Sequence, residues 1–147
     1  MFKTIVVAVD GSECSKKAVT TACDIASASN AKMIIVHAPQ AETTAFIVGG
    51  PVGYHELLTA PSHAELEETG NKIVAEAAEL AKEKGCTVET DMHIGDPVRQ
   101  VLKVAKDKDA DLIVMGRRGL GSVASLFLGS TSQKIQHHAT CACLTVV

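Results

Sequence analysis

Two segments near the C-terminus have the composition of a phosphate-binding site. The first, residues 116–121, follows a short apolar run and contains three glycines. The second starts at Gly129 and continues with three hydroxyl residues, 130–132, where we expect a helix to begin. Glycine lets the backbone approach an anion closely, and the N–H groups of a helix's first turn point at it. We therefore predict that the stretch 111–132 binds the phosphates of a nucleotide.

Two common nucleotide-binding motifs are absent from the sequence. Residues 116–121 have the glycine spacing of a Walker A loop, but Ser122 stands where that loop carries its lysine. No G-x-G-x-x-G follows the first expected strand, which argues against a standard dinucleotide site. The alternative for residues 116–121 is a tight turn with no ligand. For both segments to face one anion, residues 122–128 must fold back between them.

Five short apolar runs predict the strands that would position these loops. They cover residues 2–10, 32–38, 86–94, 112–115 and 142–147. Stretches with helical spacing separate them, and a longer segment, 39–61, contains glycines and prolines without a period. Alternation of strands and helices indicates an α/β fold. We expect a doubly wound, five-stranded parallel sheet of order 3-2-1-4-5 with helices on both faces.

Helix-capping residues mark where the expected helices begin and end. Ser12 and Asp96 are suited to the N-cap position, and Pro97 to the first helical position. Ser62 and Glu65 have the spacing of a capping box. At the other end of two helices stand Asn30 and Gly85, which accept the left-handed backbone of a C-cap.

Composition limits the class of protein. The chain has 147 residues, which we interpret as one domain spanning 1–147, and a net charge of −3, which argues against nucleic-acid binding. It contains neither an 18-residue apolar run nor a signal-peptide pattern, so we expect no membrane span. Its five scattered cysteines favour the reduced cytoplasm over a disulfide framework.

Ligands of doubly wound sheets bind at the carboxyl ends of the strands, where the winding reverses. In the predicted order, Asp10 ends the first strand, and His37 and Ala38 end the second. Gly95 and Gly116 end the third and fourth strands. The glycine segments and these strand ends therefore fall at one edge of the predicted sheet.

Over its whole length the sequence resembles the nucleotide-binding branch of the universal stress protein family. The similar motifs are IVVAVDGS at the start, VHA after the second strand, G-D-P after the third, and DLIVMGRRGLGSVASLFLGSTSQKI. The resemblance implies a Rossmann-like fold of the adenine nucleotide alpha hydrolase type. It also implies a nucleotide site made of Val9, Asp10, Ala38, Met115, Gly116, Arg118, Gly119, Gly129, Ser130, Thr131 and Ser132.

Within that implied site, Asp10 would contact the ribose and the backbone of Ala38 would hold adenine. The residues from Gly129 to Ser132 would bind phosphate. The resemblance implies ATP, or AMP or ADP, with Mg²⁺ as an accompanying ion. It also implies a homodimer through residues 142–147 and a regulatory role in the stress response with a protein partner.

Two other functions remain open on the sequence. One is a partner-binding module that has the fold without using nucleotide, and the other is a slow ATPase. No general base or nucleophile–base pair accompanies the glycine segments, so we expect no catalytic residues. Two polar clusters could suggest metal sites: His137, His138, Cys141 and Cys143, and Asp107, Asp109 and Asp111. We favour structural thiols and helix-end histidines for the first cluster and a solvated helix end for the second, and we predict no metal site.

Overall fold

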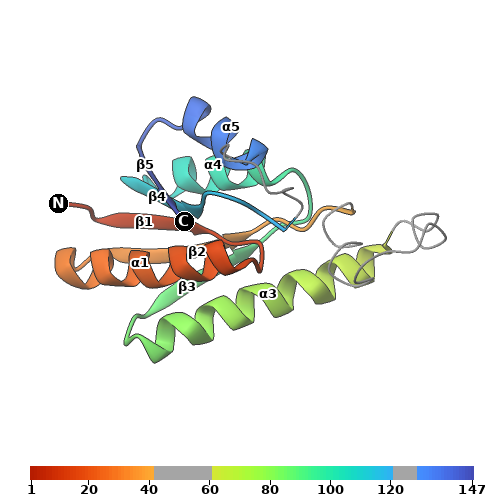
Figure 1. Cartoon of the computed structure of the whole chain (residues 1–147), viewed down its shortest axis with the longest axis horizontal. Helices are drawn as coiled ribbons and strands as arrows, with labels where there is room; N and C mark the ends of the chain where they lie inside the picture. Colours follow the sequence, from red (N-terminus) through yellow and green to blue (C-terminus); the bar gives the residue numbers. More distant parts are fainter. Residues whose placement is uncertain (42–60, 121–128) are drawn as a thin grey trace.

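The protein consists of a parallel sheet with helices on both faces (Figure 1). The structure is a computed structural model, and it describes residues 1–41, 61–120 and 129–147. The described strands are β1 (Thr4–Ala8), β2 (Lys32–His37), β3 (Val88–Met92), β4 (Leu112–Gly116) and β5 (Ala142–Val146). The described helices are α1 (Glu13–Ser29), α3 (His63–Glu83), α4 (Pro97–Asp107) and α5 (Ser130–His138). The strand order is β3-β2-β1-β4-β5, which confirms the predicted doubly wound topology.

The centre of the sheet is the most apolar part of the chain. β1 pairs in parallel with β2 on one side and with β4 on the other, so that Val6 lies between Ile34 and Ile113. All three of these side chains are buried. A strand covered on both faces needs a continuous apolar sequence, and this is why these three strands lack polar alternation.

Helices cover the sheet as two separate layers. α1 and α3 lie on one face, and α4 and α5 lie on the other (Figure 1). Val7 and Ile35 point into the cluster under α1 and α3, whereas Val6 and Ile34 point into the cluster under α4 and α5. Adjacent residues of each strand therefore supply opposite cores, as the period of two in a strand requires.

The predicted caps fix the ends of the helices. The Ser12 side chain accepts from Ser15 N–H, and Asn30 adopts the left-handed conformation with φ of 51°. Ser62 and Glu65 form the complete capping box of α3, and Pro97 begins α4 after its N-cap Asp96. α3 reaches its C-cap one residue earlier than predicted, because Gly85 follows the cap with φ of +79°.

Most of the strands are shorter than the apolar runs that predicted them. β1 ends at Ala8 instead of Asp10, and β3 covers 88–92 instead of 86–94. The chain leaves the regular ladder gradually, since the Val9 N–H still donates to the carbonyl of Val36 at 2.9 Å. Apolar sequence thus continues beyond the paired residues into the strand-end region. Most of the predicted 39–61 loop lies outside the described residues.

Two acidic residues, one at the end of α4 and one just before β4, have separate structural partners. Asp107 pairs with Lys103 at 2.7 Å within the helix. Asp111 accepts from the N–H groups of Lys3 and Thr4 at 2.6 and 2.8 Å, and these hydrogen bonds lower the pKa of its carboxyl group. Asp111 therefore ties the start of the chain to the start of β4.

Within the described residues, no helix combines the length and the apolar character that crossing a membrane requires.

Candidate functional site

The ends of β1, β2 and β4 lie side by side because these strands are parallel neighbours in the sheet. The chain emerges from them at Asp10, Ala38 and Gly116 respectively. The Asp10 carboxylate accepts from Ser12 N–H through Oδ1 at 2.9 Å, so this side chain is held at the start of α1. The structure thus brings together three of the predicted site residues at one edge.

Glycines after β4 permit two close approaches to the β1–α1 segment. A Cβ placed on Gly116 would lie 2.8 Å from Cys14 Cβ and 2.9 Å from the Cys14 carbonyl carbon. A Cβ on Gly119 would lie 2.7 Å from Asp10 Oδ2. The first approach is to backbone and the second is to a carboxylate. Gly116 therefore allows α1 to pack against the end of β4, and Gly119 leaves room for the Asp10 side chain.

The two predicted glycine segments meet in space. Gly129 N–H donates to the carbonyl oxygen of Arg117 at 2.9 Å. The Ser132 hydroxyl lies 3.1 Å from the same carbonyl oxygen and 2.9 Å from the Gly129 carbonyl oxygen. Residues 121–128 lie outside the described part, but the residues on both sides of them have the arrangement that a fold-back requires. The start of α5 is therefore joined to the end of β4.

At the start of α5 the backbone donors are unused within the described structure. Gly129 is the N-cap and has no side chain to accept from them. No acceptor among the described residues takes the N–H groups of Ser130, Thr131 or Ser132. Ser130 and Thr131 are exposed, whereas the hydroxyl of Ser132 is buried against the carbonyls described above. Ser132 can therefore offer an anion its N–H more readily than its hydroxyl.

The backbone of two arginines lies next to Gly129, since a Cβ there would be 3.1 Å from the Arg117 carbonyl oxygen and 3.6 Å from Arg118 Cα. Nε of Arg117 and Nε of Arg118 are both buried, and neither has a hydrogen-bond partner among the described residues. A buried guanidinium N–H without an acceptor is costly unless an anion or water takes it. The end of β4 and the start of α5 thus carry positive charge and unused donors together.

On the β2 side of β1, the His37 side chain bonds to the backbone just after the end of β1. Its Nδ1 lies 2.7 Å from the carbonyl oxygen of Val9, and the side chain is buried. Burial lowers the pKa of His37, although the bond to Val9 and the charge of Asp10 oppose that change. The neutral ring therefore donates Nδ1–H to Val9. Ala38 has no hydrogen bond from its N–H or carbonyl to a described residue.

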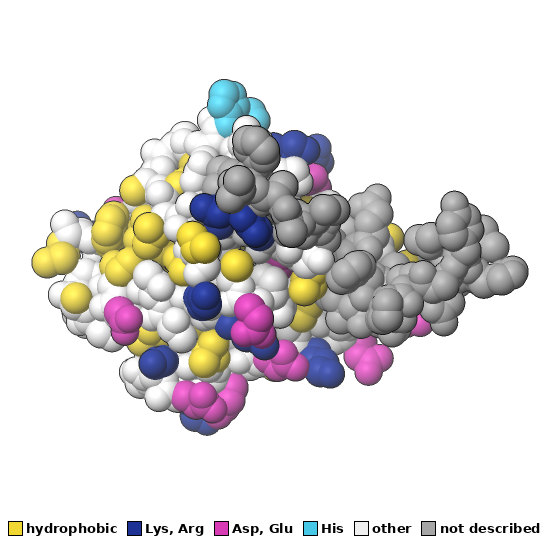
Figure 2. All heavy atoms as spheres, viewed as in Figure 1, with side chains coloured by type: hydrophobic (Ala, Val, Ile, Leu, Met, Phe, Trp, Pro, Cys, Tyr) yellow, Lys and Arg dark blue, Asp and Glu magenta, His cyan; other side chains and the backbone are white. Residues whose placement is uncertain are grey.

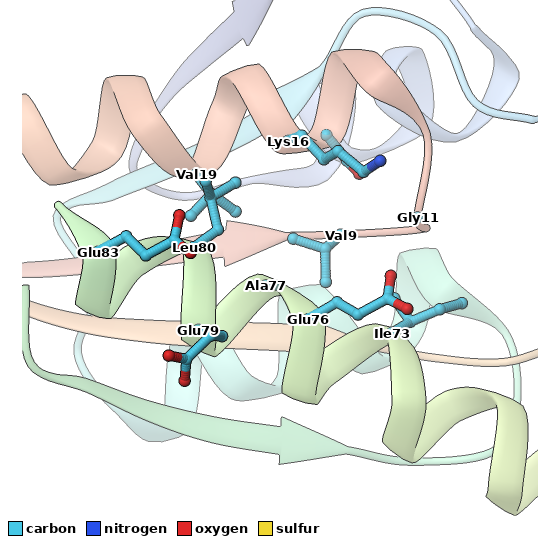
Figure 3. Close-up of a pocket in the computed structure, with 11 residues that line it drawn as sticks. Val9, Gly11, Lys16, Val19, Ile73, Glu76, Ala77, Glu79, Leu80 and Glu83 are labelled. Carbon is cyan, nitrogen blue, oxygen red and sulfur yellow. The ribbon is translucent and has the colours of Figure 1, made fainter.

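Two predicted site residues face away from this edge with their side chains. Met115 is buried in the cluster under α4 and α5. Val9 is buried under α1 and α3, where it lines a cavity of about 350 Å³ (Figure 3). Either residue can contribute only its backbone to a ligand at the strand ends. Among the predicted site residues, Val9 alone lines that cavity, which is therefore a different hollow of the molecule.

Sequence reasoning missed two features of this edge. His37 was placed at the end of the second strand, but its side-chain bond to Val9 was not predicted. The carbonyl of Arg117 accepts from Gly129 N–H and lies 3.1 Å from the Ser132 hydroxyl. Neither feature has a sequence signal, because both depend on which backbone atoms meet in the folded chain.

The residues of the other suggested metal cluster make contacts of a structural kind. Cys141 and Cys143 pack against the cluster under α4 and α5, and burial raises the pKa of both thiols. The rings of His137 and His138 lie edge to face, with centroids 4.9 Å apart. In the described ranges, no three His, Cys, Asp or Glu side chains are grouped to hold a metal ion.

Comparison with known proteins agrees with this architecture. A model of the universal stress protein family matches residues 1–146. Universal stress protein YxiE of Bacillus subtilis (strain 168) is 36% identical over 147 residues, with 99% of each chain covered. A universal stress protein of Thermus aquaticus, from the QAH/OAS sulfhydrylase 3′ region, is 41% identical over 147 residues with the same coverage.

A solved structure of similar sequence contains an adenine nucleotide. The crystal structure of a universal stress protein in complex with cAMP is 31% identical and has a TM-score of 0.72. The likeness covers 99% of this chain and 97% of that chain. Both the full-length family match and the identities to these relatives lead to one conclusion: the chain belongs to the universal stress protein family.

Proposed function

We propose that this protein binds an adenine nucleotide, ATP in the first place, at the edge formed by the ends of β1, β2 and β4. The observation that carries the proposal is the bond from Gly129 N–H to the Arg117 carbonyl. It holds the N–H groups at the start of α5, which have no acceptor among the described residues, beside the backbone of two arginines whose Nε atoms likewise lack acceptors there. Donors and positive charge at a helix start favour a phosphate group.

The adenine and ribose would bind at the β1 and β2 ends. The N–H and carbonyl of Ala38, which have no partner in the described part of the chain, match the acceptor and donor on the edge of an adenine ring. The Asp10 carboxylate, fixed through Oδ1 by Ser12 N–H, would accept from a ribose hydroxyl. The related cAMP complex supports an adenine nucleotide as the ligand class. We propose ATP, rather than AMP or ADP, because two arginines directly follow β4 at the proposed phosphate end.

Mg²⁺ would accompany ATP mainly through the phosphates and water. We assign one carboxylate among the described residues of this edge to the site, that of Asp10. Its Oδ1 already accepts a hydrogen bond from Ser12 N–H. A single carboxylate with phosphate oxygens is a common arrangement for Mg²⁺. The protein's own residues would therefore orient the nucleotide, and the ion would be held by the ligand.

We also propose that the nucleotide-bound protein is a regulatory homodimer of the cytoplasm that acts on a protein partner in the stress response. β5 pairs with β4 on one side, so it forms an edge of the described sheet. Hydrophobic side chains gather on the surface where Figure 1 has β5 and the C-terminus (Figure 2). An apolar edge strand favours pairing with a second chain. All five cysteines are free thiols, in keeping with a reducing compartment.

The decisive measurement is mass spectrometry of nucleotide released from the purified, denatured protein, followed by calorimetric titration with ATP and Mg²⁺. Arg118→Gln should weaken ATP binding about tenfold, the loss of one charge-assisted hydrogen bond, and should weaken AMP binding less. Arg99→Gln is the charge-matched control, since Arg99 is exposed on α4. Absence of any adenine-nucleotide binding at millimolar ATP would leave the partner-binding module as the function.

A further inference from the structure

Three sulfur atoms from distant parts of the sequence converge beneath α1. Cys23 lies on α1, Met33 on β2, and Cys86 between α3 and β3. Cys23 Sγ is 3.9 Å from Met33 Sδ. The Cys86 thiol donates to the Cys23 carbonyl oxygen at 3.6 Å, which places Cys86 beside Cys23. None of the three residues belongs to the proposed nucleotide site.

The backbone fixes the positions of the two residues that flank Cys23. Met33 is in register with Val88, and Cys86 stands two residues before Val88. The left-handed Gly85 turns the chain after α3, and the Cys86 N–H then donates to the Ala81 carbonyl at 2.9 Å. Cys86 is thereby directed to the same core that contains Met33 and Cys23.

The sulfur cluster is closed on one side and reachable on the other. Cys23 and Met33 are each 1% exposed, whereas Cys86 is half-buried. The Cys86 thiol lies 3.7 Å from the hydroxyl of Ser27, an exposed residue of α1. Cys86 is therefore the member of the cluster that is most accessible to solvent.

We propose that Cys23, Met33 and Cys86 form a three-sulfur site for a soft monovalent metal ion, with Cu(I) as the biological example. Thiolate and thioether ligands select Cu(I), and hard ions such as Mg²⁺ require oxygen donors. With metal–sulfur bonds of about 2.3 Å, a trigonal site places its sulfurs about 4 Å apart. The observed separation of 3.9 Å between Cys23 and Met33 fits that geometry.

Binding at this site would be an exchange of ions. One Cu(I) enters, two metal–thiolate bonds and one metal–thioether bond form, and the two thiol protons leave to solvent. No electron is transferred and no co-reactant is needed.

The test is a titration of the full chain, reduced and under argon, with Cu(I) in competition with a chromophoric chelator such as bathocuproine disulfonate. Cys14, Cys141 and Cys143 are first replaced by serine, which leaves Cys23 and Cys86 as the remaining thiols. We expect this triple variant to take one Cu(I) per chain. No uptake against the chelator would overturn the site.

Two further variants in that background test the individual ligands. Cys86→Ser should remove Cu(I) binding, and Met33→Leu should weaken it at least tenfold while circular dichroism and urea unfolding show an intact fold. A Met33→Leu variant of unchanged affinity would overturn the three-sulfur site, as would a Cys86→Ser variant that still binds one ion. X-ray absorption at the copper edge should find sulfur neighbours at about 2.3 Å, and oxygen or nitrogen neighbours would contradict the assignment.

Discussion

Gly129 donates its N–H to the carbonyl oxygen of Arg117 at 2.9 Å, and this bond joins two segments of the chain that are twelve residues apart. A Cβ on Gly129 would lie 3.1 Å from the same oxygen, so the contact favours a residue without a side chain. The bond holds the first turn of α5 against the end of β4. The predicted phosphate site depends on this contact more than on either glycine segment alone.

Ser132 and Ser130 should have different effects when their hydroxyls are removed. Ser132→Ala should lower the free energy of unfolding by about 1 kcal/mol, because its buried hydroxyl bonds the carbonyls that join α5 to β4. Ser130→Ala is the matched control, since Ser130 is exposed and its hydroxyl has no such bond among the described residues. Urea unfolding of both variants measures the difference. Equal stability of the two variants would contradict the structural role given to Ser132.

Substitutions at Gly116 and Gly119 should separate stability from binding. Gly116→Ala should reduce the free energy of unfolding by about 1–3 kcal/mol, because the added methyl meets the backbone of Cys14. Gly119→Ala should leave most of the stability intact but displace the Asp10 carboxylate, whose Oδ2 would be 2.7 Å from the new methyl. In Gly119→Ala, nucleotide affinity should therefore fall while the free energy of unfolding stays close to that of wild type. Calorimetric titration and thermal unfolding of the same preparations test this contrast. A Gly119→Ala variant that loses stability but keeps its nucleotide affinity would contradict it.

The buried His37 should make the protein less stable as the pH falls. The pKa of His37 is lowered in the folded state, so the unfolded chain takes up a proton near its usual pKa of about 6.5 before the folded chain does. The contribution of the neutral ring is complete above that pH. It is lost as the pH falls from about 6.5 through the lowered pKa, with a slope of at most about 1.4 kcal/mol per pH unit.

Urea unfolding between pH 7.5 and 5.5 measures the effect of His37. His37→Gln should flatten the dependence on pH. His63→Gln is the control, because His63 is an exposed residue of α3 and should leave the slope unchanged. The same slope in wild type and His37→Gln would show that another group causes the acid sensitivity.

The outer edge of β5 offers a selective test of the proposed dimer. The Ala142 N–H and the Val146 carbonyl bond toward β4, so the alternating geometry of the strand turns the Thr145 N–H outward. Thr145→Pro should therefore remove an edge donor without breaking the pairing with β4. We expect it to be monomeric in analytical ultracentrifugation at a concentration at which wild type is dimeric. Thr145→Val keeps the N–H and should remain dimeric; a dimeric proline variant would exclude this edge.

Much of the architecture was predictable because it depends on local chemistry. Ser12, Ser62 and Asp96 start helices through side-chain bonds to residues three positions away, and the sequence displays that spacing. Continuous apolar runs identified the central strands, since both faces of β1, β2 and β4 are buried. The strand ends were less predictable, because Val9 keeps one ladder bond after regular pairing stops.

The sequence by itself determined the kinds of residue available at the site: an aspartate after β1, two glycine segments around residue 120, and hydroxyls at a helix start. Tertiary structure decided which of their atoms are free. It buried the Ser132 hydroxyl on two carbonyls, directed His37 to the Val9 carbonyl, and left Ala38 without a backbone partner among the described residues. It also brought Cys23, Met33 and Cys86 together. These outcomes depend on contacts between residues far apart in the chain, and residue type and spacing carry no record of such contacts.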